Sequence, residues 1–282
     1  MAVGPHPVAG PAPGRLPGGR PGRLGLRGPT DPADELPAAL AEVRTGSLAG
    51  VNLTTPHKQA AVPLLDQLER PADALQAVNT VRRLDGRLAG ANTDVAGALW
   101  ALGGQLGLRD PGWDGAGPAV LLGTGGVALA VAFAYARLAE ARQGLGLQTS
   151  PLTVVGRDPA RVARTVALAG PGATGAAFTR AAGLVAGATV LLQATTLTAQ
   201  GVAVPGRDRL RPGARVLDCN YGPGAQGLVA AARDQGARAA VDGLGMLVAQ
   251  AAGAVAKIAG VRPDLPAMAA AVGLDWPGSP PP

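Results

Sequence analysis

The 282-residue chain has very few aromatic side chains and only one cysteine. Aromatic residues make up 2% of the sequence and hydrophobic residues 47%, so alanine, valine and leucine must build the core. Because Cys219 stands alone, an internal disulfide is impossible, and we expect no bound metal. A chain of this length can bury two cores of ordinary size, so two domains are expected.

Long apolar runs and basic surface patterns are also missing. No uninterrupted apolar span reaches membrane length, and the N-terminus lacks the apolar stretch typical of a signal peptide. Residues 1–30 supply four of the six net positive charges, from Arg15, Arg20, Arg23 and Arg27. The rest is nearly balanced and shows no basic stripe with interleaved aromatics. We expect a cytoplasmic protein that binds neither nucleic acid nor membrane, and a homodimer remains open.

Residues 1–30 differ in composition from everything that follows. Half of them are glycine or proline, without a regular apolar period, so the segment is predicted to be disordered or loosely packed. The pattern changes at Asp31. Leu36, Leu40 and Val43 then recur at helical spacing, which predicts a helix over 35–44.

The remaining first half is predicted to mix short strands and helices. Asp85-Gly86 favours a type I′ hairpin turn, and Asp94 is a suitable N-cap. The expected elements are a strand over 50–54, a helix over 57–68, strands over 77–82 and 87–91, and a helix from 94 to about 107.

The second half alternates strand and helix after a turn-rich linker at residues 108–117. This βαβ alternation is typical of an α/β fold, with a parallel sheet covered by helices on both faces. The expected strands are 118–122, 152–155, 189–192 and 215–218, and the expected helices are 127–139, one starting at 159, 228–235 and 246–258.

A glycine-rich turn joins the first of these strands to its helix. Gly123-Thr-Gly-Gly126, followed by Val127, would let the backbone approach a pyrophosphate while the helix N-terminus presents free N–H groups. The alternative is a purely structural βα turn. The strand before and the long helix after favour nucleotide binding.

The cofactor type should be set after the second strand, where acidic residues favour a ribose hydroxyl and arginine favours a 2′-phosphate. Asp158 precedes Pro159 and is expected to cap the next helix. That leaves Arg157 and Arg161 to face the cofactor, which favours NADP over NAD. A solvated surface position for Arg161 is the alternative.

A second group of polar residues could hold a small molecule with several hydroxyl groups. Asn52, Thr54 and Lys58 lie at a strand end, a turn and a helix start, and Asp94 could meet Lys58. Burial favours a neutral lysine and an adjacent carboxylate favours a charged one, so Asp94 is better interpreted as an anchor for substrate and lysine. The alternative is a surface ion pair that contributes little.

Six motifs in order resemble the shikimate dehydrogenase family, over about residues 35–260. The resemblance implies a Rossmann-like doubly wound sheet plus a smaller α/β substrate domain, with residues 1–107 and 243–282 flanking an NADP-binding domain at 108–242. It also implies reversible reduction of 3-dehydroshikimate to shikimate, in the pathway to chorismate and the aromatic amino acids. The motifs are Val51–Lys58, Ala77–Thr80, Asn92–Asp94, Gly123–Gly126, Asp218–Tyr221 and Asp242–Gln250.

The resemblance also assigns roles to individual residues. Lys58 would transfer the proton with Asp94 beside it, and His57 would line the cleft. Substrate would be bound by Asn52, Thr54, Asn79, Tyr221 and Gln250. The cofactor would be bound by Gly123, Thr124, Gly125, Gly126, Val127, Arg157, Arg161, Gly243 and Met246.

The chain departs from the family pattern mainly at its N-terminus. The family begins with a Ser-x-Ser-Pro segment that binds the substrate carboxylate, but no serine precedes Ser47. A frameshifted or misassigned start is one hypothesis for residues 1–30. An impaired NADP-binding homologue and a quinate dehydrogenase are the alternative functions, whereas Asn92-Thr-Asp94 with Gln250 argues against a folate-pathway dehydrogenase. Smaller departures are Gly156, Gln193 with Thr196, and Gln226-Gly227.

Overall fold

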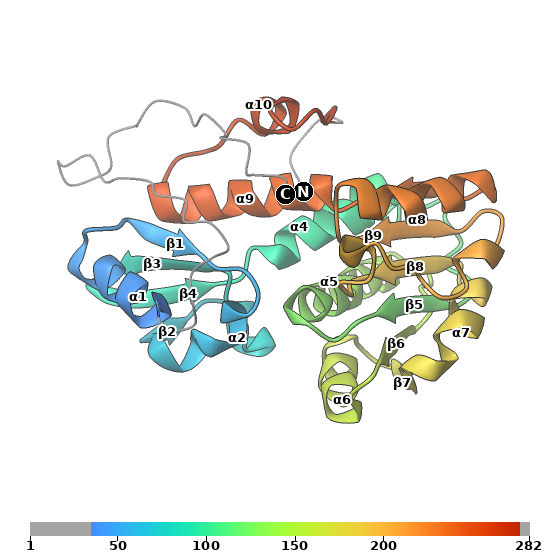
Figure 1. Cartoon of the computed structure of the whole chain (residues 1–282), viewed down its shortest axis with the longest axis horizontal. Helices are drawn as coiled ribbons and strands as arrows, with labels where there is room; N and C mark the ends of the chain where they lie inside the picture. The colour runs from blue at the N-terminus through green and yellow to red at the C-terminus, as the bar shows by residue number, and fades with distance from the viewer. Residues whose placement is uncertain (1–34, 277–282) are drawn as a thin grey trace.

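The chain folds around two separate β-sheets that lie side by side, and helix α9 runs along the smaller one (Figure 1). The computed structural model describes residues 35–276. The segment 1–30, predicted to be disordered, lies outside the described residues. Within the described part, no helix is both long and apolar enough to cross a bilayer.

The smaller sheet has four strands in the order β1-β3-β4-β2. The tight turn between β3 and β4 has positive φ at Asp85 (49°) and Gly86 (79°), which confirms the predicted type I′ geometry. Helix α1 (Glu35–Thr45) packs Leu40 and Val43 into the core beside this sheet. The strands are β1 (Gly50–Asn52), β2 (Gln67–Leu68), β3 (Thr80–Leu84) and β4 (Arg87–Ala91).

The helix predicted over 57–68 is wrong beyond its first turn. Helix α2 covers only His57–Ala60 and gives way to a 3₁₀ turn at Val62–Leu64. Pro63 explains the break, because proline lacks an N–H and its ring clashes with the preceding helical turn. The chain then forms β2, which pairs parallel to β4.

The strand predicted over 77–82 starts three residues later than expected. The N–H of Val78 donates to the carbonyl of Lys58 at 2.7 Å, so this backbone bonds to α2 before it can join the sheet. The strand β3 therefore begins at Thr80. The short helix α3 (Ala72–Leu75) precedes it.

The larger sheet is entirely parallel, in the order β10-β9-β8-β5-β6-β7. This order is the doubly wound, Rossmann-like arrangement, whose ligand site lies where the strand order reverses, here between β5 and β8. Its strands are β5 (Ala119–Leu122), β6 (Leu152–Gly156), β7 (Thr174–Ala177), β8 (Val190–Gln193), β9 (Arg215–Asp218) and β10 (Ala239–Val241).

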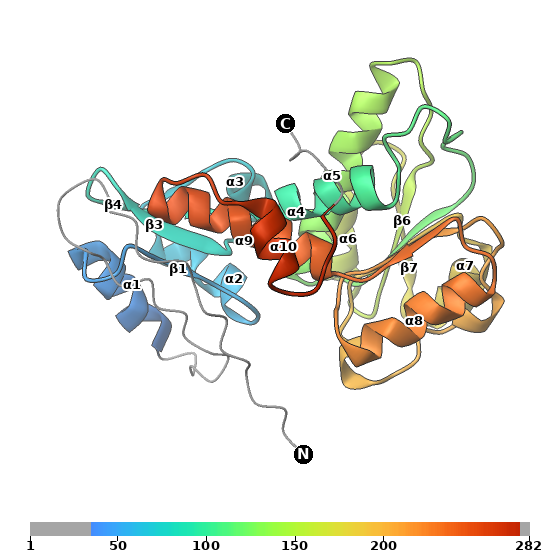
Figure 2. The ribbon, with the colours of Figure 1, turned by 90° about the horizontal axis from the view of Figure 1, so that it is seen from above.

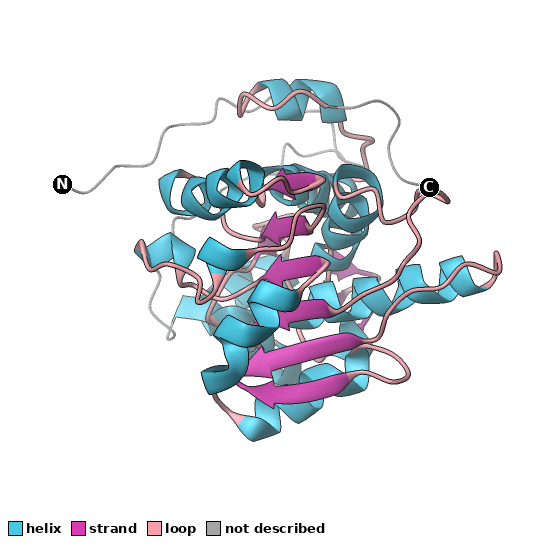
Figure 3. Ribbon diagram, turned by 90° about the vertical axis from the view of Figure 1, so that its right-hand side faces the viewer, coloured by secondary structure: helices cyan, strands magenta, loops and turns pink. Residues whose placement is uncertain are grey.

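Helices cover both faces of the larger sheet, which confirms the predicted α/β class (Figure 3). Alternate residues of one strand enter different cores: Leu121 packs with α5, while Val120 and Leu122 pack with α7 and α8. The helices are α5 (Gly126–Gln143), α6 (Pro159–Leu168), α7 (Ala181–Gly187) and α8 (Pro223–Asp234), with 3₁₀ turns at Phe178–Arg180, Thr198–Gln200 and Arg207–Arg209.

Two long helical segments join the sheets, as the view from above shows (Figure 2). Helix α4 (Asp94–Trp100) continues as a π-helical turn (Ala101–Gln105), and α9 (Leu244–Ala259) packs against it. The helices approach closely because Gly97 has no side chain: a Cβ there would lie 2.7 Å from the carbonyl oxygen of Met246. Helix α10 (Leu265–Ala270) follows.

Candidate active site

A buried ion pair lies on the side of the smaller sheet that faces the larger one. Lys58 Nζ donates to Asp94 Oδ2 at 2.6 Å, and the two side chains are 11% and 6% exposed. Lys58 comes from α2 and Asp94 from the start of α4. The structure therefore brings together the two residues that the sequence placed 36 positions apart.

An amide cluster fixes the carboxylate of this pair. Asn79 Nδ2 donates to Asp94 Oδ1 at 2.9 Å, and the backbone N–H of Asp94 donates to Asn92 Oδ1 at 3.1 Å. Asn79 Oδ1 accepts from the N–H of Thr93 at 2.8 Å. Because both carboxylate oxygens are bonded, Asp94 holds the Lys58 ammonium group in one place.

Helix α9 contributes one further side chain to this cluster. Gln250 Oε1 lies 3.2 Å from Asn79 Nδ2 and 3.4 Å from Thr93 Oγ1. Gly253, one turn later, leaves room for the Thr93 methyl group, since a Cβ there would lie 3.2 Å from it. Sequence reasoning left Thr93 out of the site, although it lies between Asn92 and Asp94 in a motif that was recognised.

Three other predicted substrate residues lie apart from this cluster. Asn52 and Thr54 are exposed, at the end of β1 and in the turn before α2. Tyr221, in the loop between β9 and α8, is 55% exposed. No side-chain hydrogen bond within residues 35–276 links any of them to Lys58 or Asp94. The half-buried His57 directly precedes Lys58.

The glycine turn has the features of a phosphate site. Gly123 adopts φ 115°, and a Cβ there would lie 2.7 Å from the carbonyl oxygen of Ala194, so this turn requires glycine. A Cβ on Gly125 would meet nothing within 4 Å. Helix α5 starts at Gly126 without a side-chain cap, which leaves its first N–H groups available to an anion.

The two halves of the site touch at the start of α5. A Cβ placed on Gly126 would lie 3.3 Å from Lys58 Cδ. The aliphatic part of the Lys58 side chain thus packs directly against the glycine turn. A substrate held at Lys58 and a nucleotide held at the turn would be neighbours.

The predicted helix cap after β6 is confirmed. Asp158 accepts from the N–H groups of Ala160 (2.9 Å) and Arg161 (3.2 Å). Arg161 Nε lies 3.7 Å from Asp158 Oδ2 in an exposed pair, whereas Arg157 is exposed without a hydrogen-bonded or ionic partner among the described residues. A free guanidinium at this point suits a phosphate.

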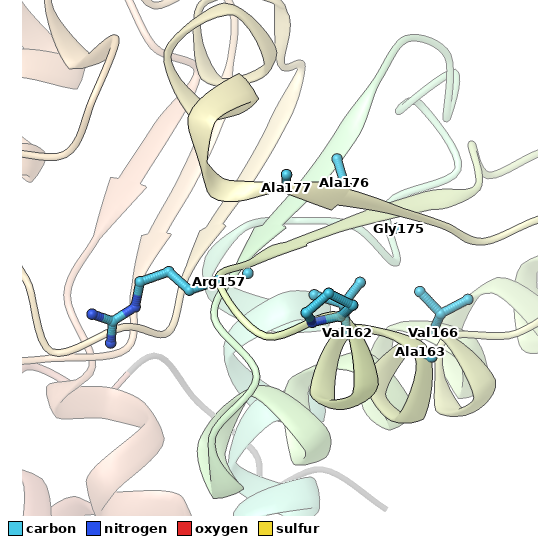
Figure 4. A pocket seen from close by; sticks show the side chains of 9 residues that line it. Arg157, Val162, Ala163, Val166, Gly175, Ala176 and Ala177 are labelled. Carbon is cyan, nitrogen blue, oxygen red and sulfur yellow. The ribbon is translucent and has the colours of Figure 1, made fainter.

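A groove of about 390 Å³ lies between α6 and β7, apart from the Lys58–Asp94 pair. Its lining beyond Arg157 is apolar, and Figure 4 shows the Arg157 side chain extending away from Val162, Ala163 and Val166. The residues that can carry chemistry lie elsewhere, at Lys58 and the glycine turn.

Two groups lie at the end of β9: Asp218, its last residue, and Cys219, which follows it. Burial raises the pKa of the Cys219 thiol well above its usual range, so it stays protonated and unreactive. Burial also raises the pKa of Asp218, whose Oδ2 has no partner although the residue is completely buried.

In β8, the buried Gln193 departs from the family pattern. Its Oε1 accepts from the N–H and the hydroxyl of Thr195, each at 3.0 Å, so the side-chain oxygen is satisfied.

The family model described as the shikimate dehydrogenase substrate binding domain matches residues 28–81. The chain is also 40% identical over 240 residues to the shikimate dehydrogenase (NADP(+)) of Rhodospirillum rubrum, an alignment that covers 82% of this chain and 80% of the relative. The chain belongs to the shikimate dehydrogenase family.

Solved structures of the family agree with this assignment. Shikimate 5-dehydrogenase from Thermus thermophilus in complex with shikimate matches with a TM-score of 0.66 and 33% identity, covering 86% of this chain and 83% of that one. Quinate dehydrogenase from Corynebacterium glutamicum in complex with NAD matches with a TM-score of 0.69 and 29% identity, covering 88% and 85%. The two-domain Rossmann-like fold is thus shared.

Proposed function

We propose that this protein catalyses the NADP-dependent, reversible reduction of 3-dehydroshikimate to shikimate. The observation that carries the proposal is the buried Lys58–Asp94 pair, bonded through Asn79 to Gln250 and packed against Gly126 of the nucleotide turn. The same activity is named for the R. rubrum relative. Similarity over most of both chains favours this activity over an impaired homologue.

In this proposal the chain's own residues bind, orient and move one proton. Bound NADPH supplies the hydride for the ring carbonyl carbon. The Lys58 ammonium group gives its proton to the oxygen that becomes the hydroxyl, and in the reverse direction its amine takes that proton back. Asp94 holds Lys58 in place, while Asn79 and Gln250 offer amides to the other hydroxyl groups.

The remaining assignments belong to the same proposal. Asn52, Thr54 and Tyr221 contact the substrate from the rim of the cleft. The N–H groups of the glycine turn would hold the cofactor phosphates, and Arg157, with Arg161 beside it, would bind the 2′-phosphate. Gly243 and Met246, at the start of α9, would hold the nicotinamide end of the cofactor. Residues 108–242 form the NADP domain and the flanking segments the substrate domain of a cytoplasmic enzyme.

The substrate carboxylate is the part of the ligand for which the described residues offer no assigned partner. The Ser-x-Ser-Pro segment of the family was not found in the sequence, and residues 1–34 lie outside the described part of the chain.

The test measures formation of the reduced cofactor, NADPH or NADH, by the purified chain. Shikimate and quinate are each offered with NADP and with NAD, and initial rates give kcat/KM for the four combinations. We expect the highest value for shikimate with NADP. A higher value for quinate would move the proposal to a quinate dehydrogenase. No turnover of either substrate, with NADPH still bound, would support the impaired homologue.

A further inference from the structure

Three loops at the carboxyl end of the larger sheet meet at Asn220, which bonds one of them through its side chain and another through its backbone carbonyl. Its Nδ2 lies 2.8 Å from the carbonyl oxygen of Thr195, 2.9 Å from Thr198 Oγ1 and 2.9 Å from Asp218 Oδ1. The carbonyl oxygen of Asn220 accepts from the N–H of Gly243 at 2.8 Å. We call these five residues the loop junction.

The junction also accounts for the burial of a carboxylate. Asp218 Oδ1 accepts from both the backbone N–H (3.0 Å) and the side chain of Asn220, while Oδ2 has no partner. No cation pairs with Asp218 among the described residues, and Asp242 lies near enough to oppose its charge. Asn220 therefore supplies two donors to this buried carboxylate, beside a hydrogen bond from the Thr198 side chain.

The loops that meet at the junction carry both halves of the proposed site. Thr195 lies against the glycine turn, since a Cβ on Gly123 would lie 3.2 Å from its nitrogen. Tyr221 directly follows Asn220, and Gly243 opens α9, the helix that carries Gln250. A shift of Asn220 would therefore move Tyr221 and α9 relative to the glycine turn.

We propose that Asn220 is a positioning residue for hydride transfer: it holds Tyr221 and the start of α9 in register with the nucleotide turn. Its side chain binds Thr195 and Thr198, and this fixes the position of its backbone carbonyl, which accepts from Gly243. This inference rests on the proposed function and adds to it a residue outside the predicted site.

The two ends of the cofactor should respond differently to loss of this amide. The phosphate end is held by the glycine turn and Arg157, which Asn220 does not contact. Strand pairing and Gln193 also keep Ala194 and Thr195 in place without it. The nicotinamide end, in the proposed site, would lie at Gly243 of the junction. Cofactor affinity should therefore survive, while the alignment of the reacting atoms should suffer.

The experiment compares Asn220→Ala with Gln226→Ala, a matched amide in the adjacent helix whose exposed side chain bonds to Asp242. We expect kcat of Asn220→Ala to fall about 10²-fold, the loss typical of misaligned reactants, with the Kd for NADPH within about threefold of wild type. Gln226→Ala should match wild type in both. An unchanged kcat, or a Kd for NADPH that rises as much as kcat falls, would overturn the inference.

Two additions keep the test decisive. If Asn220→Ala does not fold, Thr198→Val removes one acceptor of the same amide: a fall in kcat with unchanged NADPH affinity supports positioning, and a wild-type kcat refutes it. If the wild-type chain does not oxidise shikimate, the proposed function fails independently of the role of Asn220.

Amide hydrogen exchange then tests whether Asn220 holds the loop junction together. Faster exchange at 195–198 and 243 in Asn220→Ala supports this role, and unchanged exchange refutes it.

Discussion

The chain contains only two lysines, and each forms an ion pair of the same length with a carboxylate. Lys58 Nζ lies 2.6 Å from Asp94, and Lys257 Nζ lies 2.6 Å from Glu69. The first pair faces the nucleotide turn. The second joins α9 to the segment after β2. The distance from Nζ to the carboxylate therefore does not identify which lysine transfers a proton.

The surroundings separate the two pairs. Lys58 and Asp94 are 11% and 6% exposed, and Asp94 is further held by neutral amides. Lys257 and Glu69 are 34% and 22% exposed, and Glu69 also binds Arg82 at 3.0 Å. A buried lysine paired with one buried carboxylate is suited to proton transfer. A carboxylate shared by two cations instead serves to link secondary-structure elements.

Replacing the two carboxylates should give a large contrast. In Asp94→Asn the Lys58 ammonium group loses its charged anchor, and we expect kcat to fall about 10²-fold, as for a misplaced catalytic group. Glu69→Gln, the matched change in the second pair, should leave kcat close to wild type. Steady-state kinetics of both variants measures this. Equal losses would mean that the two pairs are not functionally different.

A smaller effect is expected at the exposed cofactor side. Arg157→Ala should weaken NADP binding about 10- to 100-fold, since a hydrogen bond to a charged group contributes about 1.5–3 kcal/mol. Binding of NAD, which lacks the 2′-phosphate, should not change. Titration of both cofactors tests this, with Arg137→Ala as the control because the contacts of Arg137, with Glu140 and the Phe133 ring, stay on α5. Parallel loss of NADP and NAD affinity would argue against the assignment.

The smallest effect concerns the stability supplied by the second pair. Burial alone would raise the pKa of Glu69, but hydrogen bonds from Lys257 and Arg82 outweigh it and lower the pKa below its ordinary value. A carboxylate with a lowered pKa stabilises the fold above its unfolded pKa and loses that contribution as pH falls through the folded one.

Glu69→Gln should therefore lower Tm by about 2–4 °C at neutral pH, for a loss near 1 kcal/mol. The difference from wild type should disappear in acid. Thermal melts of both proteins, from neutral pH down to below the pKa of Glu69, measure this difference in Tm. A Tm difference that persists unchanged at low pH would show that charge is not the cause.

The sequence predicted the larger sheet better than the smaller one. Each buried strand of the larger sheet is bounded by turn residues, and Arg215–Asp218 was predicted without error. Strands β7 and β10 were missed because Thr174–Ala177 and Ala239–Val241 are short and rich in alanine and glycine. In the smaller sheet, tertiary pairing of Gln67–Leu68 with β4 overrode an apolar spacing that suggested a helix.

The site was predictable where one motif supplied several contacts. Lys58, Asp94 and Asn79 were recognised from their motifs, and their buried network lies within three connected segments. Asn220 lies in the recognised motif Asp218–Tyr221, but its role was not predicted because it depends on contacts with Thr195 and Gly243 in other loops. Contacts between loops of a parallel sheet cannot be read from spacing along one chain.

The most direct test of the account uses the two lysines themselves. Lys58→Ala and Lys257→Ala are assayed side by side for NADPH formation from shikimate, with NADPH binding as the check that each variant is folded. We expect kcat of Lys58→Ala to fall by about 10²–10⁴-fold, the range for loss of a general acid–base, and that of Lys257→Ala to stay near wild type. Full activity in Lys58→Ala, or an equal loss in both variants, would contradict the assignment of Lys58 as the proton-transfer residue.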